Sequence, residues 1–324
     1  MTAWLARRLI QAAFIVLAMT MIVFVAVSVI GDPVEVLISQ DANQAERERI
    51  TAEFGLDKSI WLQYGKFLGE VAQGNMGKSF VYGEPTLKVI LGRMPATMEL
   101  AVTAMLISVL LGIPLGLYAG LRPQSIFSKA IMGLSMLGFS LPTFWVGLLF
   151  IMIFAVQLGW LPSMGRGETV TVFGIPWSFL TVDGLRHLVL PALTLALFKI
   201  SLVMRLTRAG VREVMPQEFI KFARAKGLKE SRVIGVHVFK NILIPVVTVL
   251  GLEFASLIAF SVVTETIFAW PGMGKLIIDS ISKLDRPMIV AYLMMIVFLF
   301  VTINLVVDFI YTLLDPRVRI DNQA

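Results

Sequence analysis

The segment Arg212–Pro245 reads REVMPQEFIKFARAKGLKESRVIGVHVFKNILIP and is strongly charged, although it lies between two apolar runs. Pro216 has no backbone N–H and suits the first position of a new helix. Glu218 follows in the first turn, where a carboxylate interacts favourably with the helix dipole. Gly227 is typical of a residue that ends a helix. The segment therefore predicts a short helix over 217–227 that is too polar to cross a bilayer.

This predicted helix has one narrow apolar face. Phe219, Phe222 and Ala223 follow one another at i, i+3, i+4 spacing. After Gly227 a second short helix is expected, with Ser231 as its N-cap. Composition alone would favour amphipathic helices that lie on anionic lipid.

The composition of the whole chain indicates a polytopic membrane protein. Of its 324 residues, 57% are hydrophobic and 15% are charged, and the mean hydropathy is +0.83, values far too apolar for a soluble domain. The chain has no cysteine, which excludes disulfides, zinc–thiolate sites and cysteine nucleophiles. Its two histidines, His187 and His237, are too few and too far apart for a multi-histidine metal site. Membrane topology explains the net charge of +6 better than a nucleic-acid partner does.

Six apolar runs predict an all-α protein with six transmembrane helices, at 9–30, 100–121, 130–158, 188–204, 242–268 and 288–314. A signal peptide is the alternative for the first run, but that run is longer than the usual apolar core of about 7–15 residues, which favours an uncleaved helix. Pro142, near the middle of the third run, predicts a kink. Lys and Arg are concentrated in alternate loops, which predicts that both termini are cytoplasmic.

Four ionisable residues fall at membrane depth, where charges are costly and often functional: Lys199, Glu253, Glu265 and Asp308. Lys199 can pair with Glu253 or Asp308 across helices, and structural pairing is favoured over direct contact with a substrate. Glu265 stands near the outer end of its helix, where its side chain is expected to reach the interface. No grouping of nucleophile, base and orienting acid supports an enzyme. Gly77-Lys78-Ser79 ends like a phosphate-binding loop, but Ala72 stands where that motif needs glycine.

Several motifs carry a family resemblance. The polar loop resembles the EAA loop of ABC-importer permeases, and its sequence is typical of the dipeptide/oligopeptide branch. The resemblance lies in Phe222-Ala223-Arg224-Ala225-Lys226-Gly227, followed by Ile242-Leu243-Ile244-Pro245. Phe222-Ala223-Arg224 departs from the nominal Glu-Ala-Ala, at positions where this branch commonly varies. Ser140–Trp145 and Ala269–Lys275 also match family signatures.

The resemblance implies a type I permease fold with six helices. It implies an N-terminal region 1–95, made of the first helix (9–30) and an extracytoplasmic loop (31–95), then a permease domain 96–314 that contains the loop 212–245, then a cytoplasmic tail 315–324. The loop would couple the chain to an ATPase through Glu218, Phe219, Lys221, Phe222, Ala223, Arg224, Ala225, Lys226 and Gly227. The two phenylalanines would be the apolar anchors, and Lys221, Arg224 and Lys226 would surround them.

The same resemblance implies partners and cargo. The chain would work in a bacterial cytoplasmic membrane with a second homologous permease, two ATPase subunits and an extracytoplasmic binding protein. It would bind no cofactor itself, because ATP and Mg would be held by the ATPase subunits. Dipeptides and oligopeptides are the expected cargo, with nickel chelates, glutathione or short sugars as alternatives.

A function of another class is a secondary carrier with an ion or proton relay through Lys199, Glu253 and Asp308. It predicts uptake driven by a gradient, without ATP. The sequence shows no internal repeat of the kind that many such carriers contain, which counts against it.

Overall fold

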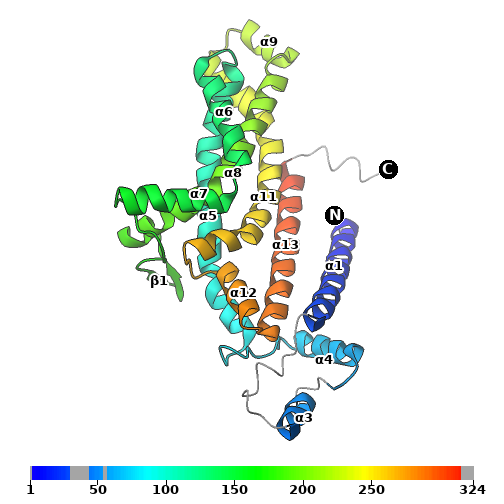
Figure 1. The fold of residues 1–324 in the computed structure, drawn as a ribbon. Helices are drawn as coiled ribbons and strands as arrows, with labels where there is room; N and C mark the ends of the chain where they lie inside the picture. Colours follow the sequence, from blue (N-terminus) through cyan, green and yellow to red (C-terminus); the bar gives the residue numbers. More distant parts are fainter. Residues whose placement is uncertain (1, 30–43, 54–56, 315–324) are drawn as a thin grey trace. The chain divides into compact units, whose positions relative to one another are not determined.

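The computed structural model describes residues 2–29, 44–53 and 57–314, and most of them are helical (Figure 1). Parts of the predicted extracytoplasmic loop (31–43 and 54–56) and the tail 315–324 lie outside these ranges. The elements are α1 (Thr2–Val29), α3 (Gln44–Glu53), α4 (Ile60–Ala72), α5 (Thr86–Leu121), α6 (Ile126–Ser140), α7 (Thr143–Phe150), the π-helix η1 (Ile151–Gln157), β1 (Val170–Val172), β2 (Ile175–Trp177), α8 (Val182–Val214), α9 (Glu218–Ala225), α10 (Glu230–Arg232), the π-helix η2 (Val233–Val238), α11 (Phe239–Ile267), α12 (Met273–Ser282) and α13 (Arg286–Leu314).

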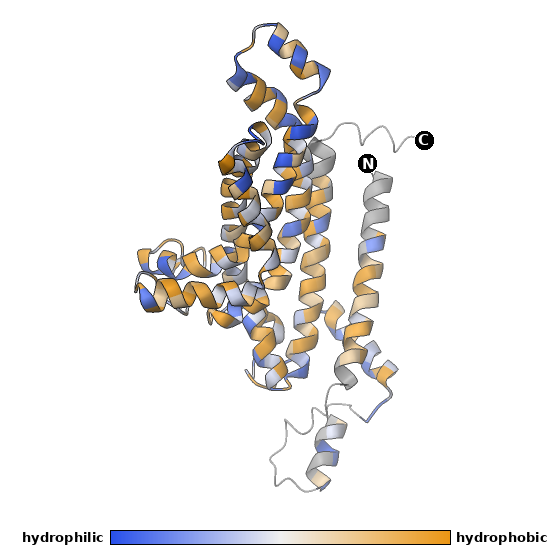
Figure 2. Ribbon diagram, turned by 45° about the horizontal axis from the view of Figure 1, so that its top comes forward, coloured by the Kyte–Doolittle hydropathy of each residue, from blue (hydrophilic) through white to orange (hydrophobic). Residues whose placement is uncertain are grey.

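The chain divides into two compact units. The first combines Met1–Thr97 with Pro271–Thr302, and the second combines Met98–Trp270 with Ile303–Ala324. Apolar residues run along the long helices, and hydrophilic residues recur around α9 (Figure 2).

Four described helices are long and apolar enough to cross a membrane: Thr86–Leu121, Val182–Val214, Pro245–Ile267 and Arg286–Val307. The bent pair formed by α6 and α7–η1 makes a fifth if it counts as one span. In α1 the qualifying apolar stretch is the shorter Ala13–Ala26. The described chain thus shows four or five of the six spans that the sequence predicts.

The predicted kink at Pro142 is a complete break. α6 ends at Ser140 and α7 begins at Thr143, and the two segments are bent by 107°. Leu141 and Pro142 are both extended, with ψ of 133° and 134°. The reason is local, because the ring of a proline disfavours helical backbone at the residue before it.

Small residues bring α5 against α8 in the second unit. A Cβ on Gly112, Gly116 or Gly120 would lie 2.8, 2.5 or 2.6 Å from the nearest atom of Val203, Met204 and Val211 respectively. These distances are too short for a side chain, so the glycines permit a close helix contact that is typical of membrane helices. The N-terminus of α8 is capped by the Thr181 hydroxyl, which accepts a hydrogen bond from the Gly184 N–H at 2.9 Å.

In the first unit the segment before α5 is held by a buried acid. The Asp285 carboxylate accepts hydrogen bonds from the Ser79 hydroxyl and from the Phe80 N–H, the latter at 3.1 Å. Ser79 therefore has a structural role in the motif that resembles the end of a phosphate-binding loop. α5 then begins at Thr86 and continues through Pro95, so the part of the predicted 31–95 loop from Thr86 onward is helical.

Candidate functional site

The loop between α8 and α11 contains the short helix that the sequence predicts. α9 runs from Glu218 to Ala225, with Gln217 as its N-cap. Gly227 has φ +75°, and its N–H donates to the Arg224 carbonyl at 2.9 Å. The Leu228 N–H donates to the Ala223 carbonyl at 3.3 Å. These two bonds form a Schellman motif, so Gly227 ends the helix as predicted.

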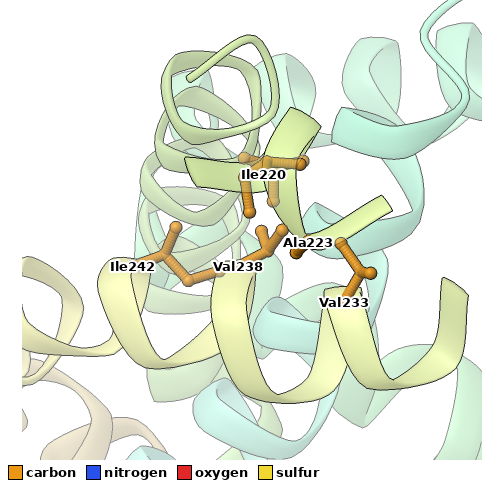
Figure 3. Close-up of a cluster of buried hydrophobic side chains, with 6 residues drawn as sticks. Ile220, Ala223, Val233, Val238 and Ile242 are labelled. Carbon is orange, nitrogen blue, oxygen red and sulfur yellow. The ribbon is translucent and has the colours of Figure 1, made fainter. Parts of the chain in front are cut away.

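One face of α9 is fixed to the rest of the loop. Ile220 is 0% exposed and Ala223 is 5% exposed. They pack in a buried cluster with Val211, Val233, Val238 and Ile242, which come from α8, η2 and α11 (Figure 3). This cluster ties the short helix to both neighbouring long helices.

The other face of α9 carries two exposed aromatic rings. Phe219 is 42% exposed and Phe222 is 61% exposed. The structure therefore separates the single apolar face of the sequence analysis into an exposed side with the phenylalanines and a buried side with Ala223. Ile220, which the sequence analysis did not select, is the more deeply buried anchor.

Several charged side chains of the loop contact one another or an aromatic ring. Arg224 donates to Glu230 through its Nε and one terminal nitrogen, at 3.1 and 2.6 Å. The Glu230 carboxylate raises the pKa of Arg224, and the Arg224 guanidinium lowers the pKa of Glu230. Lys221 lies 2.8 Å from Glu218. The Lys226 ammonium lies 4.5 Å from the centre of the Phe222 ring.

The N-terminus of the loop's second helix differs from the prediction. Ser231 lies inside α10, and Lys229 occupies the N-cap position. Helical residues then continue without interruption from Glu230 through η2 to the end of α11 at Ile267. The second half of the loop is therefore a direct extension of a membrane-spanning helix. Ala225 is exposed at the end of α9.

Lys199 on α8 and Glu253 on α11 form an ion pair. The Ser256 hydroxyl completes the group, because it accepts from the Lys199 ammonium at 2.7 Å and donates to the Glu253 carboxylate at 3.0 Å. The pair joins two long helices at membrane depth. The side chain of Asp308 lies outside the described residues, and only its place in α13 is known.

Glu265 does not reach the interface as expected. Its side chain is fully buried, and its carboxylate accepts a hydrogen bond from the Ser261 hydroxyl at 2.9 Å. The expectation rested on its place near a helix end. Phe268 and Trp270, which follow that helix end, are buried as well, so the end lies inside the protein and not at its surface.

A further buried ion pair was missed by the sequence analysis. Arg166 donates to Glu99 at 2.7 and 3.0 Å and to the Pro176 carbonyl at 2.7 Å. The second carboxylate oxygen of Glu99 accepts from the N–H groups of Ser178 and Phe179, at 2.8 and 2.9 Å. Both carboxylate oxygens of Glu99 therefore accept hydrogen bonds. These bonds hold the β1–β2 hairpin and the residues after it against α5. No local pattern marks two residues that stand 67 positions apart.

Long apolar helices and a polar loop that contains a short helix with one buried and one exposed side define a polytopic membrane protein. Residues 112–320 match the family described as "binding-protein-dependent transport system inner membrane component", and residues 1–101 match the N-terminal family of the same systems. The chain belongs to this family of ABC-importer membrane components.

Curated relatives match along nearly the whole chain. The di/tripeptide permease DppB of Pseudomonas aeruginosa is 38% identical over 98% of this chain and 99% of its own. The oligopeptide permease AppB of Bacillus subtilis is 38% identical over 98% and 100%. The dipeptide permease DppB of Escherichia coli K12 is 34% identical over 98% and 99%.

A solved structure shares the fold. A chain from the structure of the MetNI methionine ABC transporter in inward-facing conformations matches with a TM-score of 0.56 and 16% identity. The match covers 71% of this chain and 97% of the other. The two chains therefore share a fold.

Proposed function

We propose that this chain is the permease subunit of an ATP-driven importer of dipeptides and oligopeptides, and that α9 couples it to an ATPase. The arrangement of α9 is the observation that carries the proposal. Ile220 and Ala223 fix the helix to α8 and α11, while Phe219 and Phe222 remain exposed beside it. A partner that binds the two phenylalanines can therefore move α8 and α11 together as one rigid body.

The partners follow from the family and from the loop. A second homologous permease, two ATPase subunits that hold ATP and Mg, and an extracytoplasmic binding protein complete the proposed transporter. The chain itself binds no nucleotide or other cofactor. Both termini and the α9 loop face the cytoplasm, which agrees with the concentration of Lys and Arg in the loop.

The peptide cargo rests on the relatives, which are named for dipeptides, tripeptides and oligopeptides. Nickel chelates, glutathione and short sugars are the alternatives of the same importer type. The secondary-carrier alternative is disfavoured by the group at Lys199, because Glu253 and Ser256 both engage the ammonium.

Transport by the purified complex in proteoliposomes tests the proposal. Labelled dipeptide, a longer peptide and nickel are supplied with the binding protein, with ATP on the ATPase side or without it, and with or without a proton ionophore. Peptide uptake that needs ATP and is insensitive to the ionophore is the expected result. Uptake that persists without ATP and collapses with the ionophore would establish the carrier function instead.

A further inference from the structure

The helix α4 has two different sides. Its polar side chains recur at helical spacing along one side, at Gln63, Lys66, Glu70 and Gln73. Lys66 and Glu70 form an exposed ion pair on that side. Trp61, Leu68 and Ala72 recur on another side, and the Trp61 side chain is 65% exposed. A short helix with separate apolar and polar sides is typical of a segment that lies in the plane of a membrane surface.

A third side of α4 holds the helix on α1. The Tyr64 hydroxyl is 2.9 Å from the Thr20 hydroxyl and donates to the Leu17 carbonyl at 3.2 Å. The Phe24 ring lies 5.5 Å from the Tyr64 ring and 5.4 Å from the Phe67 ring, measured between centroids. α4 therefore crosses the C-terminal half of α1 at a defined position (Figure 1).

The position of this contact relative to the membrane surface follows from α13. The Arg286 guanidinium lies 5.9 Å from the centre of the Phe24 ring. Arg286 is the first residue of an apolar span that continues to Val307. Charged residues at the end of a span mark the boundary between hydrocarbon and water, so Phe24 and the helix that packs on it lie at this boundary.

The surface of α1, on which α4 packs, is also apolar and exposed. Phe14, Leu17 and Ile22 are 72%, 52% and 60% exposed on this apolar helix. Exposed apolar side chains along an apolar helix suit contact with lipid, and the exposed apolar side of the helix that packs on α1 suits the same surroundings. Tryptophan is favoured at this depth because its ring is apolar and its N–H is polar.

We propose that α4 is an interfacial helix, with Trp61, Leu68 and Ala72 among the lipids and Lys66, Glu70 and Gln73 toward water. Its ligand is the bilayer surface of the leaflet at the Arg286 end of α13. In the proposed topology this is the leaflet that faces away from the cytoplasm. The helix would fix the segment between α1 and α5 at the membrane surface.

Single cysteines test this directly, since the natural chain has none. The complete transporter is placed in nanodiscs, and an environment-sensitive dye is attached to Trp61→Cys or Ala72→Cys, with Lys66→Cys and Gln73→Cys as matched controls on the polar side. Ala72→Cys changes little volume, which guards against a folding defect. Half of the samples contain lipid with a spin-label quencher at the headgroup boundary.

Dye at positions 61 and 72 should emit at shorter wavelength and lose several-fold more intensity to the lipid quencher than dye at 66 and 73. Equal, water-like emission at all four positions would overturn the proposal. It would also be overturned if dye at 61 and 72 escaped the quencher and shifted only when the binding protein was added, because the helix would then dock a protein. Transport activity does not enter this measurement, so its outcome is independent of the proposed function.

Discussion

Gly227 adopts a backbone conformation that residues with a side chain rarely adopt. A Cβ there would meet nothing within 4 Å, so space does not restrict the position. Its φ of +75° does, because an L-residue in the left-handed region costs about 1–2 kcal/mol. We expect Gly227→Ala to loosen the end of α9 and to reduce transport several-fold, with faster hydrogen exchange at residues 224–228.

Gly235 is the matched control for this substitution. It also has open space around it, and it lies within the helical residues of η2. Gly235→Ala should leave both exchange and transport near wild type. Equal effects of the two substitutions would show that the left-handed turn is not what ends the helix.

The pair of Arg224 and Glu230 makes the loop sensitive to acid. The guanidinium lowers the pKa of the Glu230 carboxyl. A carboxyl with a lowered folded-state pKa stabilises the loop above its unfolded pKa, and that stabilisation is lost as the pH falls through the folded-state value. The protection factors of the α9 amides, which are corrected for the slower intrinsic exchange in acid, should therefore fall as the pH drops below the usual carboxyl pKa range.

Glu230→Gln separates this effect from general acid unfolding. The variant should exchange faster at neutral pH, and its loop should show a smaller further change in acid. The prediction fails if the acid transition of the loop is the same in the variant as in the wild type.

Substitutions of Lys199 and Glu253 can show whether this ion pair stabilises the fold or takes part in an ion relay. Lys199→Met alone leaves a carboxylate without its charge partner and should destabilise the chain by about 3–5 kcal/mol. Lys199→Met with Glu253→Leu replaces both charges with apolar groups and should recover thermal stability in detergent and ATP-driven uptake. Recovered stability with uptake still absent would instead assign the pair to the translocation path.

At the scale of the element, the two sides of α9 should fail in different ways. Ile220→Ala removes buried volume and should weaken the docking of α9 by about 2–5 kcal/mol, with faster hydrogen exchange along the helix. Phe219→Ala with Phe222→Ala should leave exchange unchanged, because these rings are exposed. Both variants should insert normally and lose transport.

Phe173 is the control ring for the double variant. It is fully exposed between β1 and β2, in a part of the second unit that is remote in sequence from α9. Phe173→Ala should retain coupled ATP hydrolysis. Wild-type uptake by the variant lacking Phe219 and Phe222 would contradict the assignment of these rings as anchors.

At the scale of the whole molecule, local signals predicted local structure well. Glu218 and Gly227 mark the ends of α9 through the helix dipole and the left-handed turn, which are properties of single residues. Gly112, Gly116 and Gly120 permit the close contact of α5 with α8, because small residues at helical spacing let membrane helices approach each other. Hydrophobic runs likewise located the long helices.

Features that depend on distant residues could not be predicted. Apolar spacing does not say which side of a short helix is buried, so Ile220 was missed while Phe219 was selected. The partner of Glu99 is set by the path of the chain and not by any nearby residue. The 107° bend at Pro142 is a local feature, but it is larger than the predicted kink because Leu141 and Pro142 are both extended.

The central claim is that the exposed side of α9 touches the ATPase. The most direct test attaches a photoactivatable cross-linker to Phe222→Cys in the complete transporter, with Phe173→Cys as the control site. Illumination should join position 222 to the ATPase subunit and leave position 173 without that product. Absence of an ATPase cross-link from 222, or an equal yield from 173, would contradict the claim.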